Sequence, residues 1–121
     1  MRETLIALAA LVVLCAIGWL VPILPLEWVL SAGIGCVALG MLLGVPTGFW
    51  YHVRLYRALR AHGPLPARWW LRPTALHADL SGPERAAVLR WFYLGGAGFL
   101  LTAAGCACVM LAVGLAFLRI R

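Results

Sequence analysis

Charged residues are so unevenly spaced that they divide the chain into three long apolar stretches. A helix needs about 20 apolar residues to cross the hydrocarbon core of a bilayer, and each stretch is long enough for one crossing. The pattern predicts an all-α integral membrane protein with three transmembrane helices, in which residues 1–121 form a single membrane domain. The stretches without Asp, Glu, Lys or Arg are Thr4–Leu26, Trp28–Val53 and Trp91–Leu118, and the expected spans are about 4–24, 27–51 and 91–118.

The first two stretches are separated by a short break that contains Pro22, Pro25 and Glu27. Proline removes a helical hydrogen-bond donor and disfavours helix in the residue before it. Residues 4–53 are also far too many for one crossing. We therefore expect two helices joined by a tight turn, rather than one kinked helix.

Residues 52–90 form the one substantial polar segment, and they carry most of the arginines. Basic residues are enriched in cytoplasmic loops, so this segment is predicted to be cytoplasmic. Three crossings then place the N-terminus in the cytoplasm and the C-terminus outside, in a multi-pass protein of a prokaryotic inner (plasma) membrane. Arg119 and Arg121 at the outer end oppose this orientation but are outnumbered. The segment contains Arg54, Arg57, Arg60, Arg68, Arg72, Arg85 and Arg90 against Asp79 and Glu84.

Local signals within 52–90 extend the second and third helices beyond the bilayer. Helical spacing continues past residue 51 as far as the stop signal Gly63-Pro64. Ser81 followed by Glu84 forms a capping-box pattern, which predicts that the third helix begins near residue 82. Between these helices, tryptophans flanked by arginines are typical of a segment that lies along the membrane surface.

A stripe of small residues recurs every four positions on the second predicted helix. Small residues let two helices approach closely, so that van der Waals contact can hold them together in a membrane. The stripe predicts packing against the first and third helices of the same chain, or a seam between copies of the chain. Its members are Ala32, Cys36, Gly40, Gly44 and Gly48.

The composition narrows the class of protein further. Hydrophobic residues make up 64% of the chain and charged residues only 12%, whereas a soluble domain is about a quarter charged. A soluble globular domain and a disordered chain are both excluded. The net charge of +6 comes from arginines beside apolar spans, which indicates anionic lipid rather than nucleic acid as the partner.

Candidate chemistry is concentrated in the polar segment. The predicted spans contain no Asp, Glu, Lys or Arg at bilayer depth, which argues against a proton-coupled pump. His77 and Asp79, with Arg72 upstream, form the one grouping that resembles an acid-base site, but no nucleophile accompanies them. We expect no metal and no cofactor. The residues expected to contact lipid headgroups are Arg54, Arg57, Arg68, Trp69, Trp70, Arg72 and His77.

These features favour a structural or accessory subunit of a membrane assembly, packed through the small-residue stripe. Expected partners are anionic membrane lipids together with other membrane subunits or further copies of the chain. Two alternatives stay open: a minimal homo-oligomeric channel or transporter, and an interfacial protein or enzyme that binds anionic lipid through residues 52–90. An enzymatic role is the less favoured expectation.

Overall fold

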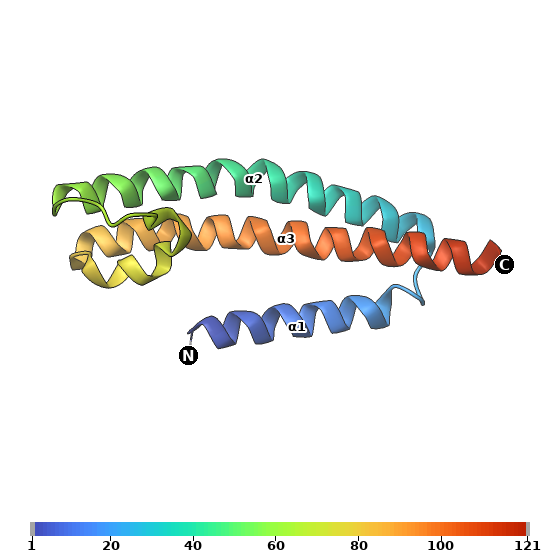
Figure 1. The fold of residues 1–121 in the computed structure, drawn as a ribbon. Helices are drawn as coiled ribbons and strands as arrows, with labels where there is room; N and C mark the ends of the chain where they lie inside the picture. The colour runs from blue at the N-terminus through green and yellow to red at the C-terminus, as the bar shows by residue number, and fades with distance from the viewer. Residues whose placement is uncertain (1, 121) are drawn as a thin grey trace. The chain divides into compact units, whose positions relative to one another are not determined.

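The computed structural model describes residues 2–120, with the side chains of residues 2, 3, 6 and 120 outside the described set. The described chain is helical apart from short connections, so the predicted all-α class is confirmed. Figure 1 shows the three α-helices in chain order. The elements are α1 (Arg2–Leu20), α2 (Leu26–Ala61), the 3-10 helices η1 (Trp69–Leu71) and η2 (Pro73–Asp79), and α3 (Gly82–Ile120).

Two of the helices are long and apolar enough to cross a membrane, namely α2 and the part of α3 from Gly82 to Arg119. The apolar part of α1, Ala7–Leu20, is shorter than the usual spanning length. The crossing expected at about 4–24 therefore stays a prediction, as does the topology built on three crossings.

The ends of the helices match the sequence signals. The helix is interrupted between Leu20 and Leu26, as the two prolines predicted. At the start of α2 the amides of Trp28 and Val29 donate to the carbonyl of Pro25. At its other end α2 stops at Ala61, two residues before Gly63, whose φ of +143° suits glycine.

The start of α3 at Gly82 also agrees with the sequence, but its cap differs in detail from the predicted box. The backbone amide of Ser81 donates to Oε2 of Glu84 over 3.3 Å, which is half of a capping box. The hydroxyl of Ser81 donates to the same carboxylate oxygen over 2.5 Å, instead of accepting a bond from the backbone. Oε2 of Glu84 therefore accepts both of these hydrogen bonds at the first turn of α3.

The chain divides into two compact units, each of which is described by itself. The first unit contains residues up to Leu42 together with those from Gly98 onward. In it, α2 and α3 meet through glycines. A Cβ atom added to Gly105 would lie 2.6 Å from the carbonyl oxygen of Gly33 and 2.8 Å from the amide of Val37, which is closer than real Cβ contacts. A Cβ atom added to Gly40 would likewise overlap Thr102 of α3.

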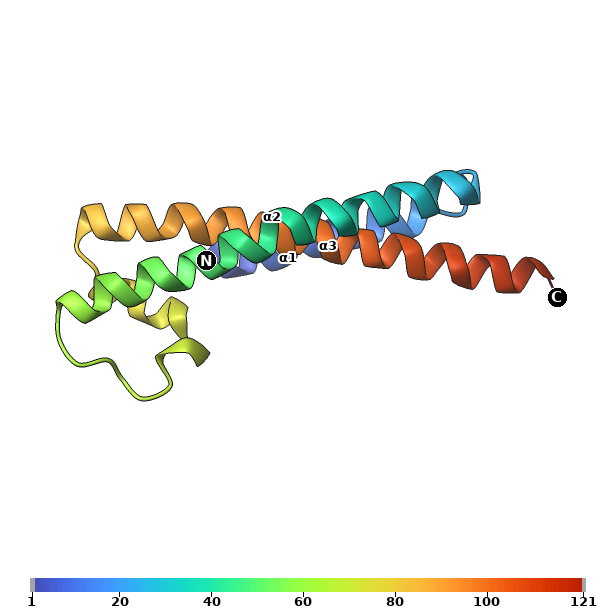
Figure 2. The same ribbon diagram turned by 90° about the horizontal axis from the view of Figure 1, so that it is seen from above.

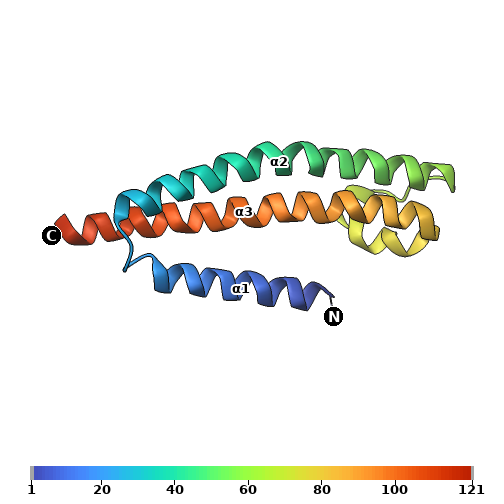
Figure 3. The same ribbon diagram turned by 180° about the vertical axis from the view of Figure 1, so that it is seen from behind.

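A small apolar cluster completes the first unit, near the turn that joins α1 to α2 (Figure 3). It is formed by Val21, Val29 and Ala112, so the end of α1, the start of α2 and the last turns of α3 meet there. Preceding turns of α1 expose apolar side chains on all sides, as the large exposures of Leu5, Leu8 and other residues show.

The second unit, Leu43–Ala97, holds the larger buried cluster. Figure 2 shows η1 and η2 beside the second half of α2, and the ring of His77 on η2 packs against Phe92 of α3. Leu55 is completely buried and Val88 almost completely, because the short helices cover the helix pair at this end. The cluster consists of Tyr51, Leu55, Leu59, Leu80 and Val88.

Members of the predicted small-residue stripe have different environments. In the first unit, Gly40 contacts α3 at Thr102 and Cys36 contacts it at Gly105, while Ala32 is exposed. Within the second unit, Gly48 contacts Gly95, and Gly44 is partly buried. These contacts are made within one chain, and a seam between copies stays a prediction.

Candidate anionic-lipid site

The connection between α2 and α3 forms a groove on the surface of the second unit. Its volume is about 450 Å³. Leu76 is shared between the groove and the buried cluster, so the floor of the groove is anchored to the core of the unit. We call it the Arg68–Arg72 groove; its lining residues are Pro66, Ala67, Arg68, Trp69, Leu71, Arg72, Ala75 and Leu76.

The electrostatics of this groove favour an anion. Both charged residues that line it are arginines, and none of the lining residues named above is Asp or Glu. Arginine presents a planar fork of donors that matches phosphate, and it does so without losing its charge. The apolar side chains beside the arginines suit the glycerol and first methylenes of a lipid better than they suit a free ion.

The acidic groups of the second unit are engaged or placed elsewhere. Glu84 binds Ser81 and, at 2.9 Å, Nε2 of His62. The hydrogen bond from the Ser81 hydroxyl, followed by the one from His62, lowers the pKa of Glu84 below its ordinary value. Asp79 is exposed on η2 and is not part of the groove lining. Neither carboxylate therefore neutralises the arginines from within the groove.

Trp69 and Trp70 have different roles in the structure, although the sequence pairs them. The ring of Trp69 lies 5.7 Å from that of Tyr56 and 6.3 Å from that of His52, and it packs against the buried cluster. Trp70 points outward and is 57% exposed. An exposed tryptophan beside a basic groove is typical of a surface that meets the headgroup region.

Arg68 has a backbone conformation that is rare for its residue type. Its φ is 60° and its ψ is 35°, in the left-handed region. It is the one non-glycine residue with positive φ among residues 2–120. For such a residue the left-handed conformation costs roughly 1–2 kcal/mol. Strain of this kind is concentrated at functional sites, where the surrounding structure holds it in place.

The arginines of α2 lie outside the groove. Arg54 stacks over the ring of Trp50 at 5.6 Å, and Arg60 donates a 2.8 Å hydrogen bond to the hydroxyl of Tyr56. Arg57 is exposed. Of the seven residues expected to contact headgroups, three line the groove, namely Arg68, Trp69 and Arg72, and Trp70 lies within the same stretch of chain.

His77 is buried, with only 7% of its surface exposed. Its Nε2 lies 2.8 Å from the hydroxyl of Tyr51, and its ring packs edge-on against Phe92. Burial, followed by the nearby charge of Arg85, lowers the pKa of His77, so the ring is neutral at pH 7. The neutral ring hydrogen-bonds the Tyr51 hydroxyl through Nε2, as acceptor when the proton is on Nδ1 and as donor when it is on Nε2. His77 thus supports the segment from inside and is not part of the groove lining.

This placement also separates the two residues of the possible acid-base grouping. His77 is inside the unit, whereas Asp79 is exposed two residues later. A general base must reach the proton that it removes from a substrate, and Nε2 of His77 is turned toward Tyr51. The geometry therefore lends no support to an acid-base role for this pair.

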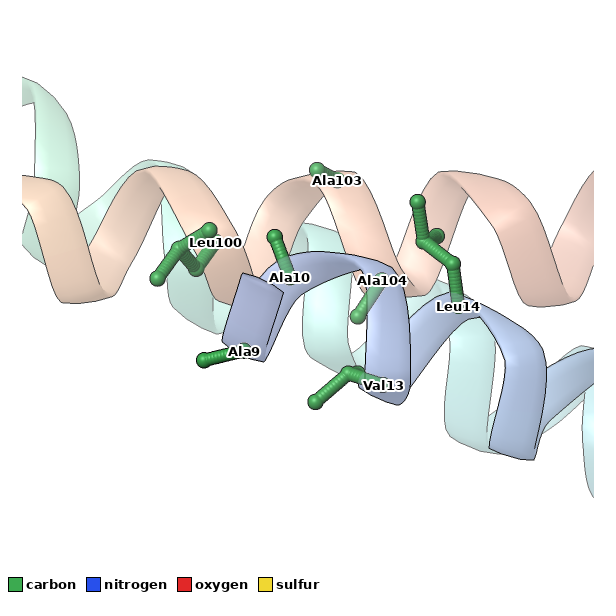
Figure 4. A pocket seen from close by; sticks show the side chains of 7 residues that line it. All are labelled: Ala9, Ala10, Val13, Leu14, Leu100, Ala103 and Ala104. Atoms are coloured by element: carbon green, nitrogen blue, oxygen red, sulfur yellow. The ribbon is translucent and has the colours of Figure 1, made fainter. Parts of the chain in front are cut away.

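The first unit has a hollow of a different character, shown in Figure 4. Its volume is about 120 Å³, and every lining residue is apolar. Small side chains of α1 and α3 line it, which leaves space between the two helices. The lining residues are Ala9, Ala10, Val13, Leu14, Leu100, Ala103 and Ala104.

Sequence reasoning missed the residues that support the groove from below. Tyr51 lies 26 positions from His77, and Tyr56 is a partner of Trp69 from a separate element. Hydrophobic spacing marks Leu55 and Leu59 as one face of a helix, but it does not show what covers that face.

Comparisons of this chain with models of protein families, with curated proteins and with solved structures found no match. The functional conclusion therefore rests on the geometry of the groove.

Proposed function

We propose that this chain is a small integral membrane protein that binds the headgroups of anionic lipids at the membrane interface, through the Arg68–Arg72 groove. The observation that carries this proposal is the lining of the groove, in which two arginines and a tryptophan adjoin apolar side chains with no carboxylate among them. This is the chemistry of a phosphate joined to a hydrocarbon tail.

Insertion of the helices into a bilayer is part of the proposal. Large apolar side chains are exposed along both long helices, and Met110 of α3 is 75% exposed. Contiguous apolar surface of this kind is rare on soluble monomers. In the proposed topology α1, α2 and α3 each cross a prokaryotic inner membrane, with the groove on the cytoplasmic face, the N-terminus inside and the C-terminus outside.

Aromatic residues support a position at the interface for this end of the molecule. Trp50 on α2 and Trp91 on α3 pack edge-on, with their ring centroids 6.2 Å apart. Both lie within a few residues of the predicted membrane edge, where tryptophan is enriched. The groove then lies beside the headgroup layer, where anionic lipid is abundant.

A structural or accessory subunit is the second candidate, and one specific observation favours it. The hollow between α1 and α3 is lined largely by alanines, and small residues are typical of surfaces where membrane helices associate. This role is compatible with lipid binding. A channel or transporter receives less support, because the large side chains exposed along the described parts of the two long helices are mainly apolar.

The test compares two pairs of substitutions that remove the same charge from the same segment. Arg68→Gln with Arg72→Gln alters the groove, and Arg54→Gln with Arg57→Gln alters the exposed face of α2. Each purified protein is examined in nanodiscs by native mass spectrometry for retention of phosphatidylglycerol against phosphatidylcholine.

Diffuse attraction to the membrane surface is worth about 1 kcal/mol per basic residue, so it predicts equal losses for the two pairs. Binding in the groove predicts a larger loss for the Arg68 and Arg72 pair, because charge-assisted hydrogen bonds contribute about 1.5–3 kcal/mol each. The expected difference is at least about fivefold in lipid retention. Equal retention by the two pairs would refute a groove site.

A further inference from the structure

The Arg68–Arg72 groove is bordered by a segment that a buried histidine holds in place. Ala75 and Leu76 of η2 line the groove, and His77 follows them directly in the same short helix. The side chain of His77 reaches inward to Tyr51 on α2. Release of His77 is therefore expected to displace Ala75 and Leu76, which belong to the same short helix and line the groove.

We propose that the Tyr51–His77 contact is a pH-sensitive latch that positions η2, so that acidification loosens the groove and weakens its hold on anionic lipid. The proposal rests on the proposed function, because the ligand of the groove is the lipid named there. We call the contact the Tyr51–His77 latch.

Geometry explains why this histidine responds to pH as a latch. It is enclosed by the Tyr51 hydroxyl from α2 at 2.8 Å and by the ring of Phe92 from α3, whose centroid is 5.6 Å away. The next residues of η2 lead to Leu80, which belongs to the buried cluster. A charge placed in this enclosure loses most of its contact with water.

The charged and titratable groups around His77 do not compensate for a proton. From α3 the nearby charge is Arg85, which repels an imidazolium. From α2 the facing group is the Tyr51 hydroxyl, with His52 packed behind it at 4.9 Å between ring centroids. Asp79, on the same short helix as His77, is exposed.

A protonated ring can still donate to the Tyr51 oxygen, so the hydrogen bond itself survives protonation. The latch weakens because the charge is buried beside Arg85. Since the pKa of His77 is lowered in the closed state, the open state binds the proton more tightly. The latch is therefore fully stable above pH 6.5, the ordinary value for histidine, and weakens as the pH falls below it.

The size of the effect follows from this linkage. If the open state titrates at the ordinary value of 6.5 and the closed state resists protonation, the opening equilibrium rises by up to about tenfold between pH 7.5 and pH 5.5. The affinity of the groove for lipid then falls in proportion to how much more weakly the open form binds lipid than the closed form does.

The test uses the full chain in phosphatidylcholine nanodiscs and measures two quantities at pH 7.5 and pH 5.5. Hydrogen exchange of residues 73–80, corrected for the intrinsic effect of pH, reports opening of η2. Titration with short-chain phosphatidylglycerol reports binding in the groove. We expect faster corrected exchange and weaker binding at pH 5.5.

Two substitutions identify the titrating group. His77→Gln keeps a side chain that hydrogen-bonds Tyr51 but does not titrate, and it should flatten both pH profiles. His62→Gln, at the exposed partner of Glu84, should leave both profiles as in the wild type. Tyr51→Phe keeps the ring without the hydroxyl, and it should speed exchange of residues 73–80 already at pH 7.5.

The outcomes separate the latch from the proposed function. Exchange that does not change with pH, or that changes equally in His77→Gln, overturns the latch, and so does unaltered exchange in Tyr51→Phe. Accelerated exchange with equal lipid binding at both pH values overturns the link between latch and groove. Accelerated exchange with no phosphatidylglycerol binding at either pH leaves the latch standing and overturns the proposed function.

Discussion

The close approach of α2 and α3 at Gly105 in the first unit predicts that a single methyl group there disturbs the helix pair. An added Cβ would lie 2.6 Å from the carbonyl oxygen of Gly33, 2.8 Å from the amide of Val37 and 2.9 Å from Cβ of Cys36. Two of these atoms belong to the backbone, so no side-chain rotation relieves the overlap. The helices must separate locally by about an ångström to restore ordinary van der Waals distances.

Gly114 provides a matched control on the same helix and in the same unit. A Cβ added there meets nothing within 4 Å. Both substitutions to alanine gain the same helix propensity, roughly 1 kcal/mol relative to glycine. The difference between Gly105→Ala and Gly114→Ala therefore isolates the steric effect, which we expect to be about 1–3 kcal/mol, the usual cost of overpacking.

Reversible unfolding in mixed micelles, with a denaturing detergent as titrant, measures this difference. Gly105→Ala should unfold at a lower detergent fraction than Gly114→Ala, and Gly114→Ala should unfold at a higher fraction than the wild type because it gains helix propensity without steric overlap. Coinciding unfolding curves for the two variants would show that α2 and α3 do not approach closely at Gly105.

Two further predictions concern the second unit. Leu55→Ala, at the fully buried centre of the cluster, should lower the free energy of unfolding by about 2–5 kcal/mol. Leu43→Ala, at an exposed position of α2 in the same unit, should change it far less, and equal losses would contradict the assigned core. Ser81→Ala should raise the pKa of Glu84 toward its ordinary value, because the hydrogen bond from the Ser81 hydroxyl is the largest cause of its lowering. NMR titration of the Glu84 carboxyl group in both proteins measures this change, and the same pKa in both would contradict the prediction.

Much of the helical pattern could be read from the sequence, because its signals are local. Each signal acts within about one turn of the chain. The signals are the two prolines within the first break, the glycine and proline that follow Ala61, and the spacing of Ser81 and Glu84. Local signals of this kind do not depend on what the helix packs against. The predicted crossing by α1 does not follow from such local signals, since it depends on how far this helix remains apolar.

The residues that support the groove could not be predicted from the sequence, because their contacts are not local. The Tyr51–His77 bond joins elements that are 26 residues apart, and nothing in the spacing of either residue indicates the other. His77 looks like part of a solvated loop, because its neighbours in sequence include Asp79 and Arg72. Only the fold of η2 onto α2 turns its side chain inward.

The small-residue stripe shows how one pattern permits several structures. A four-residue step places Ala32, Cys36 and Gly40 on one side of a helix, and any partner helix of similar shape can use that side. In the first unit α3 contacts Gly40 and Cys36, and it also contacts Gly33, which lies outside the step. The face used by α3 is thus shifted around the helix from the face that the stripe defines.

The position of α3 on α2 affects the two proposed roles, lipid binding and association with other subunits, in different ways. With Gly33 and Gly40 engaged by α3, Ala32 is left exposed next to Trp28 and Ile17, in an apolar groove of about 300 Å³. A partner helix could not use the centre of the stripe without displacing α3. Lipid binding by the Arg68–Arg72 groove requires no such exchange, because its residues are already at the surface of the second unit. The proposed lipid binding therefore needs only the single chain, whereas the proposed association with other subunits would have to use surfaces that α3 leaves free.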